Sequence, residues 1–503
     1  MSSQFPSSHF HPPQSKADAD PRRWVALAVL LLASFMNLID VTIVNVALPS
    51  LQQNLGADPT QIEWVIAAYV LAFALGLLPF GRLGDIVGRT RMFLIGVAAF
   101  TLASAFCGLA PSIEWLIVAR VLQGLAGAAM TPQVLAIAQV TFPPEEKGQA
   151  FSLFGLSAGL AAVAGPIVGG LLIGANFLDL DWRPIFLVNI PFGIFAVIAG
   201  WYLIPRTPGH PTLKNDFVGI GLFGIAMIAL VFPLVEGHAL GWPTWLWGLM
   251  AVGLLFAGIF IIWQRHLARI DQPQLLNFSL ISNPNYLLGL LITTIFASGV
   301  PAMFMVISLL LQSGYNFSPL ESGLTNTPFS VGVLAVSLFI GRLGQKYLRT
   351  RLALGAAILV VGITWLDFII RGLGDSVDHW TFLPPLLLAG LGLGLGFSGL
   401  FQSVLAGVPA RDAGAGSGAL QAFQQVGGAI GVALVGQIFF TQLAAGFAAG
   451  NAPHVAFADA AAPAIVYQII SFGLVVLLVP FLKIKRPDQS PGVPAAPPVI
   501  VEA

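Results

Sequence analysis

Long apolar runs, each of a length that can cross a lipid bilayer, divide most of this 503-residue sequence. Backbone groups in a bilayer core must be paired within the protein, so such runs fold as helices. The sequence therefore predicts an all-α polytopic membrane protein with fourteen transmembrane helices, at about 24–48, 62–81, 92–110, 115–140, 149–175, 184–204, 217–236, 243–263, 286–311, 322–341, 352–370, 381–407, 416–441 and 462–482.

Composition supports the same class. The chain is 57% hydrophobic and 9% charged, with a mean hydropathy of +0.87, which is typical of an integral membrane protein. Lys plus Arg and Asp plus Glu are both 22, so we expect no nucleic-acid partner. Cys107 is the only cysteine, and the seven histidines fall in tails or at the ends of apolar runs. We therefore expect no metal, no cofactor and no enzyme activity.

The basic residues predict the orientation. If both tails are cytoplasmic, 19 of the 22 Lys and Arg lie on that side, Arg183 and Arg371 lie outside, and Arg120 lies within a span. Residues 1–21 lack the apolar core of a secretion signal, so the first apolar run is expected to be retained. We predict cytoplasmic, disordered tails at 1–23 and 484–503.

An internal repeat predicts the domain organisation. "GRLGDIVGRTR" at 81–91 recurs 260 residues later as "GRLGQKYLRTR", with seven of eleven positions identical. Two halves of six helices, at 24–205 and 281–483, with two inserted helices at 206–280, fit this spacing. Two homologous halves around a site at the bilayer midplane are the plan of an alternating-access transporter.

Five stretches resemble the major facilitator superfamily, in particular its fourteen-helix drug:proton antiporters of the EmrB/QacA type. They are "LIDVTIVNVALP" (38–49), "GRLGDIVGRTR" (81–91), "RVLQGLAGAA" (120–129), "GPIVGG" (165–170) and "WRPIFLVNIPFG" (182–193). The resemblance implies two six-helix bundles plus two inserted helices, and export of small amphipathic compounds in exchange for protons. It also implies a bacterial inner membrane location; we expect a monomer.

The loop at 81–91 is expected to hold a conformational latch. Its glycines allow a tight turn, and Asp85 can pair with Arg89 and Arg91, since an acid suits a helix N-terminus. The alternative is that the arginines only fix the topology. The second copy has Gln345 in place of Asp85, so the latch is expected to act from the first half.

The apolar run at 149–175 carries closely spaced small residues. Gly165, Pro166, Gly169 and Gly170 match the stretch that accompanies antiport in the resembled family. Small residues let helix backbones approach closely, and ordinary tight packing explains the pattern equally well.

Asp40 is the only charged residue between Trp24 and Ser50, and a charge inside a membrane span is costly. Helix geometry places it roughly 13 Å from Pro49, at a depth comparable to that of Arg120, roughly 9 Å from Glu114. We predict that Asp40 carries the coupled proton and that Arg120 assists it. A purely structural ion pair is the alternative.

Uncharged polar residues suggest where substrate binds. Asn37 and Gln123 lie one turn from Asp40 and Arg120, and Gln421, Gln424 and Gln425 share one face of the helix at 416–441. Hydrogen bonds between helices would also account for them. We expect lipophilic, cationic or neutral substrates. The alternatives are export of one metabolite or lipid, and a receptor or scaffold that transports nothing.

Overall fold

The computed structural model describes residues 19–57, 59–175, 180–209, 214–237, 240–340 and 347–483, and every regular element within these ranges is helical. Twelve helices in this part of the chain are long and apolar enough to cross a membrane. The fold is therefore an all-helical membrane architecture, as predicted.

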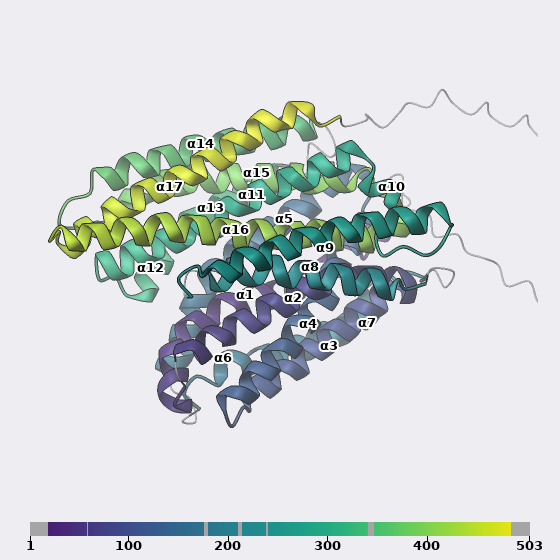
Figure 1. The fold of residues 1–503 in the computed structure, drawn as a ribbon, viewed down its shortest axis with the longest axis horizontal. Helices are drawn as coiled ribbons and strands as arrows, with labels where there is room; N and C mark the ends of the chain where they lie inside the picture. The colour runs from purple at the N-terminus through teal and green to yellow at the C-terminus, as the bar shows by residue number, and fades with distance from the viewer. Residues whose placement is uncertain are drawn as a thin grey trace, which may run out of the picture.

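Most of the first group of helices lies in the lower half of Figure 1, whereas its α5 lies among the helices of the upper half. Its closest packing joins α2 to α4, α3 to α4 and α1 to α5. The group consists of α1 (Arg23–Leu55), α2 (Pro59–Val87), α3 (Arg89–Gly108), α4 (Ile113–Thr141), α5 (Pro144–Gly174), α6 (Pro184–Leu187) and α7 (Asn189–Leu203).

The second group forms the upper half of Figure 1, with closest packing of α14 on α15, α11 on α16 and α13 on α15. Its helices are α11 (Pro284–Leu309, extended by a π-helical turn to Gly314), α12 (Pro319–Thr325), α13 (Thr327–Ile340), α14 (Leu348–Arg371), α15 (Leu383–Leu405), α16 (Ala413–Ala448) and α17 (Pro453–Leu478).

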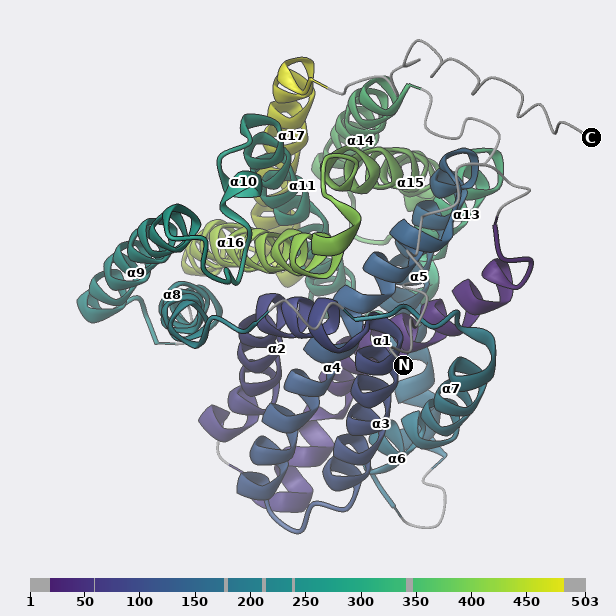
Figure 2. The same ribbon diagram turned by 90° about the vertical axis from the view of Figure 1, so that its right-hand side faces the viewer.

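Between the groups in sequence lie α8 (Phe217–Glu236), α9 (Thr244–Arg269) and the short α10 (Phe278–Ile281). Figure 2 shows α8 and α9 side by side at the edge of the molecule. α8 packs on α9 and also touches α2 and α16, one helix from each group. α8 therefore lies along the seam between α2 and α16, and α9 packs on α8.

The described chain begins and ends at one face of the molecule, on the right in Figure 1, which we term the tail face; the opposite side is the loop face. At the tail face the two groups are joined by hydrogen bonds from Ser417 Oγ to the Pro132 carbonyl (2.9 Å) and from Gln139 Nε2 to the Leu405 carbonyl (3.2 Å). Toward the loop face the groups diverge in Figure 1. The two groups are therefore in contact at the tail face and separate toward the loop face.

Several helix ends differ from the predicted ones. α1 does not stop at residue 49 but continues to Leu55, where Gly56 adopts a left-handed conformation (φ 61°) and donates its N–H to the Gln52 carbonyl. A proline removes one donor without forcing the helix to end, whereas a left-handed glycine does end it. The run at 184–204 is divided into α6 and α7, and α16 is longer than predicted at both ends.

Close backbone contacts between helices depend on glycine. A Cβ at Gly431 of α16 would lie 1.9 Å from the Ser298 carbonyl oxygen of α11, and this backbone atom cannot move aside as a flexible side chain can. At Gly248 of α9, by contrast, a Cβ would meet nothing within 4 Å.

We predict that Gly431→Val destabilises the protein by about 1–3 kcal/mol or more, because it forces α11 and α16 apart. Thermal unfolding in detergent, followed by size-exclusion chromatography, should show a lower apparent melting temperature. Gly248→Val is the matched control and should unfold within a degree of the wild type. Equal melting temperatures for both variants would contradict the tight α11–α16 contact.

Candidate functional site

Asp40 and Arg120 form an ion pair inside the first group of helices. The guanidinium Nη1 of Arg120, on α4, donates to Oδ2 of Asp40, on α1. Asp40 is completely buried and Arg120 is 1% exposed. Counted along α1 and α4, the two residues lie roughly 25 Å and 31 Å from the tail-face ends of their helices. The structure therefore brings together the two charges that the sequence placed at similar depth.

Amide groups complete the surroundings of the carboxylate. Gln123 Nε2 donates to Asp40 Oδ1 (2.8 Å), and Asn189 Nδ2 of α7 lies 3.4 Å from the same oxygen. Ser104 of α3 accepts from both amides, at 3.2 Å from Gln123 and 3.0 Å from Asn189. Uncharged amide donors from α4 and α7, positioned by Ser104 of α3, thus hold the carboxylate beside its cation.

The guanidinium has partners of its own. Arg120 Nε donates to the Val65 carbonyl (3.0 Å), and Nη1 donates to Gln123 Oε1 (2.7 Å). The Tyr69 ring of α2 lies 4.2 Å from the guanidinium carbon, close enough for a cation–π interaction. Arg120 would therefore keep several contacts if Asp40 lost its charge.

The two other polar residues predicted beside this pair are also buried. Asn37 donates from Nδ2 to the Tyr69 hydroxyl (2.6 Å), and Gln123 belongs to the hydrogen-bond network of Asp40. Asn37 is 4% exposed and Gln123 is fully buried. In this conformation both residues support the ion pair, and neither presents its side chain to solvent.

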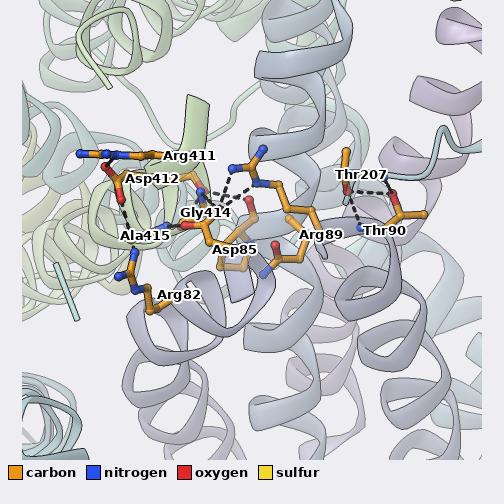
Figure 3. A network of polar contacts seen from close by, with 12 residues as sticks. Arg82, Asp85, Arg89, Thr90, Thr207, Arg411, Asp412, Gly414 and Ala415 are labelled. Carbon is orange, nitrogen blue, oxygen red and sulfur yellow. Dashed lines mark hydrogen bonds and ion pairs between the residues drawn. The ribbon is translucent and has the colours of Figure 1, made fainter. Parts of the chain in front are cut away.

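Asp85 joins the two groups of helices at the tail face (Figure 3). Its carboxylate accepts the backbone N–H groups of Gly414 and Ala415, both at 2.9 Å, at the first turn of α16. It also pairs with Arg89 one turn further along its own chain segment (2.7 Å). Helix N-termini carry unpaired N–H groups and a partial positive charge, so a buried carboxylate is favoured there.

A second ion pair crosses the same seam. Arg82 Nη1 lies 3.3 Å from Oδ1 of Asp412, the residue that precedes α16, and Asn277 Nδ2 lies 3.3 Å from the other carboxylate oxygen. Figure 3 shows Arg82 and Asp85 approaching the start of α16 side by side. Together these contacts hold the tail face closed.

Residues 81–91, predicted as a loop, are helical except for Gly88, so Asp85 lies on the last turn of α2 and the turn to α3 that follows it is held in place. Gly88 has φ 107°, a conformation that side chains disfavour, and a Cβ there would lie 2.8 Å from the Thr207 carbonyl oxygen. Thr90 N donates to Thr207 Oγ1 (3.0 Å), which caps the start of α3.

Arg91 is exposed and is not brought to Asp85. Gln345 lies outside the described residues.

The glycines of α5 face two different neighbours. A Cβ at Gly165 would lie 2.0 Å from Thr42 Oγ1 of α1, and Thr42 donates to the Ala161 carbonyl (3.0 Å). Gly159 offers its carbonyl to Ser330 of α13 (2.8 Å). Gly169 is buried, Gly170 has open space beside it, and Pro166 lies within the helix. α5 thus touches α1 on one face and the second group of helices on another.

The three glutamines of α16 that were predicted to bind substrate do not share one environment. Gln421 is 6% exposed, and its Nε2 has no hydrogen-bond partner among the described residues. Gln424 and Gln425 are half-buried. The structure therefore sets Gln421 apart from its neighbours.

Sequence reasoning missed several members of these networks. Asn189 could have been found, because it is the amide in the apolar stretch "WRPIFLVNIPFG". Asp412, an acid directly before a helix, carried a similar signal. Ser104 and Tyr69 resemble many other residues of apolar runs, and no local pattern distinguishes them.

Comparisons with known proteins agree with this architecture. Residues 30–432 match the family model described as the Major Facilitator Superfamily. A probable actinorhodin transporter of Streptomyces coelicolor is 39% identical over 83% of this chain and 73% of its own length. The multidrug resistance protein Stp of Mycobacterium tuberculosis is 32% identical over 84% of this chain and 76% of its own.

A solved structure matches the fold as well. The crystal structure of the human organic anion transporter MFSD10 superimposes with a TM-score of 0.63, covering 92% of this chain and 100% of that one. The sequence identity is 16%, so the match concerns the fold alone.

We predict that Asp85→Asn opens the tail face, because the variant loses a charge at the N-terminus of α16 and its pairing with Arg89. A loss of about 1–2 kcal/mol would shift the closed–open equilibrium roughly 5- to 30-fold. Spin labels on cysteines introduced at the exposed positions Arg206 and Gly407 measure the distance across this face. Cys107 is buried and should stay unlabelled.

Asp367→Asn is the matched control, since Asp367 forms the same i, i+4 pair with Arg371 (2.8 Å) within α14 alone. Asp85→Asn should increase the population at longer distance, and Asp367→Asn should leave it unchanged. Identical distance distributions for Asp85→Asn and the wild type would contradict the latch.

Proposed function

This chain belongs to the Major Facilitator Superfamily, and we propose that it is a proton-coupled antiporter that exports toxic small molecules by alternating access. The substrates we propose are lipophilic, cationic or neutral amphipathic compounds. The drug- and antibiotic-related names of the relatives support export, and the buried Asp40–Arg120 pair carries the proposal of proton coupling.

The proposed coupling uses the ion pair as a proton switch. Ionised Asp40 is held by Arg120 and by the amides of Gln123 and Asn189. A proton on the carboxylate removes its charge and weakens every one of these contacts, while Arg120 keeps the Val65 carbonyl and the Tyr69 ring. The link between α1 and α4 would therefore loosen on protonation and tighten on release.

α5 is the proposed route from this switch to the other half of the molecule. Thr42 lies two residues after Asp40 on α1 and binds α5 at Ala161. Two residues before Ala161, Gly159 binds Ser330 of α13. A displacement of α1 would thus reach the second group of helices through direct contacts. This is the role we propose for the motif around Gly165.

We further propose a fourteen-helix topology in a bacterial inner membrane. Twelve helices are long and apolar enough to count as spans by themselves. The 31-residue α5 would supply the thirteenth span, and α12 together with α13 would supply the fourteenth. The two six-helix domains would comprise 24–205 and 281–483, and residues 206–280 would form the inserted pair. The tail face would be cytoplasmic, as the basic residues favour.

Export of one metabolite is the second candidate, because one relative is named for a single compound, actinorhodin. Growth inhibition by a broad panel of chemically unrelated compounds, with and without the gene, separates the two. Protection against many compounds supports multidrug export. Protection against one compound supports the narrower function.

We predict that Asp40→Asn uncouples transport. The variant keeps the size of the side chain but cannot carry the proton, so purified protein in liposomes should neither concentrate substrate against a gradient nor release protons on substrate addition. Arg120→Ala should damage the same step, and Arg120→Lys should retain part of it because it keeps the charge. Arg371→Lys is the control and should transport normally. Proton-driven transport by Asp40→Asn at near wild-type rate would refute the switch.

We predict that both termini are cytoplasmic. Cysteines introduced at Ser2 and Ala503 should react with an impermeant thiol reagent only after cells are permeabilised. A cysteine at Asn451, in the turn between α16 and α17 at the loop face, is the control and should react in intact cells. Labelling of Ser2→Cys or Ala503→Cys from outside would reverse the orientation.

A further inference from the structure

One face of α16 lies directly against α2. A Cβ at Gly414 would lie 2.3 Å from the Gly81 carbonyl oxygen, and a Cβ at Gly418 would lie 2.6 Å from that of Leu77. Residues three or four positions apart share a helix face, so Gln421 and Gln425 continue this face toward the loop face. We call Gly414, Gly418, Gln421 and Gln425 the seam stripe.

The seam stripe changes character where the two groups of helices begin to diverge. Near the tail face its members are glycines, and the backbones of α2 and α16 touch. One turn further on along the same face of α16, glutamines take the place of the glycines. Gln421 lies roughly 12 Å along α16 from its tail-face end, on the face that α16 turns toward α2, and substrate sites of transporters with two homologous halves lie near the midplane between the halves.

Gln421 is the member with an unused hydrogen-bonding group. It is 6% exposed, and its Nε2 has no partner among the described residues. A buried donor without a partner is costly, so proteins seldom keep one without a reason. The backbone of α2 beside Gly418, one turn earlier in the stripe, belongs to the apolar residues Leu77 and Leu78.

We infer that Gln421 is the hydrogen-bond donor of the substrate site and selects compounds with a carbonyl oxygen, such as a ketone or quinone, on an apolar body. This inference rests on the proposed export function. An amide N–H donates but carries no charge, so it recognises an acceptor and gives a cation no advantage. The apolar residues of α2 favour a flat hydrophobic partner beside that acceptor.

The test compares two lipophilic probes that differ in the acceptor. A neutral hydroxyanthraquinone has carbonyl oxygens, whereas tetraphenylphosphonium is a cation without any acceptor. Binding is measured on the purified full chain without a proton gradient, so the result does not depend on coupling. Gln437→Leu is the matched control, because Gln437 is an exposed glutamine further along α16 that contacts Thr441 (3.2 Å).

We predict that Gln421→Leu weakens anthraquinone binding about 5- to 10-fold, as expected for one lost hydrogen bond, and changes tetraphenylphosphonium binding less than about 2-fold. Gln421→Asn should recover part of the loss. Equal losses for both probes, no loss for either, or a wild type that does not bind the anthraquinone would overturn the inference. If Asp40→Asn still couples transport while Gln421→Leu behaves as expected, the coupling proposal fails and the substrate site stands.

Discussion

The buried ion pair between Asp40 and Arg120 is the interaction on which the first group of helices depends. Neither charge is exposed to water, and removal of one partner from such a pair costs about 3–5 kcal/mol because the other charge is left buried. Polar groups from α2, α3, α4 and α7 converge on it. The relative positions of these helices are therefore tied to the charge state of one carboxylate.

α2 connects this pair to the closed seam at the tail face. Its Val65 carbonyl and Tyr69 ring contact Arg120, and Asp85, sixteen residues after Tyr69 and roughly 24 Å away, binds the start of α16. α16 has no room to shift there without separating its backbone from that of α2, because glycines bring the two into contact. A change at the ion pair and a change at the latch thus act on the same rigid helix.

Much of this arrangement could be predicted from the sequence, and the exceptions have physical reasons. Asp40 and Arg120 were predictable because a charge within an apolar run is costly and is rarely kept there without a partner or a function. Their depths agreed with each other, although α1 continues past Pro49. Arg89 was predictable as a partner of Asp85, but the partners on α16 were not, since they are backbone N–H groups about 330 residues away and any residue could supply them. Arg91 lies two positions after Arg89, about 200° further around the helix, so it faces solvent.

The proposed proton site and the proposed substrate site lie in different halves of the molecule, which limits how they can communicate. They share no contact, so any coupling must pass as a displacement of helices through α5 on one side of the seam and α2 on the other. Tight backbone contacts suit this task, because a closely packed interface moves as a unit instead of deforming gradually. Under the proposed mechanism the glycines of α5 and α16 would serve coupling and packing by the same physical property. A substitution that widens either contact should then weaken the link between the two sites without touching either one.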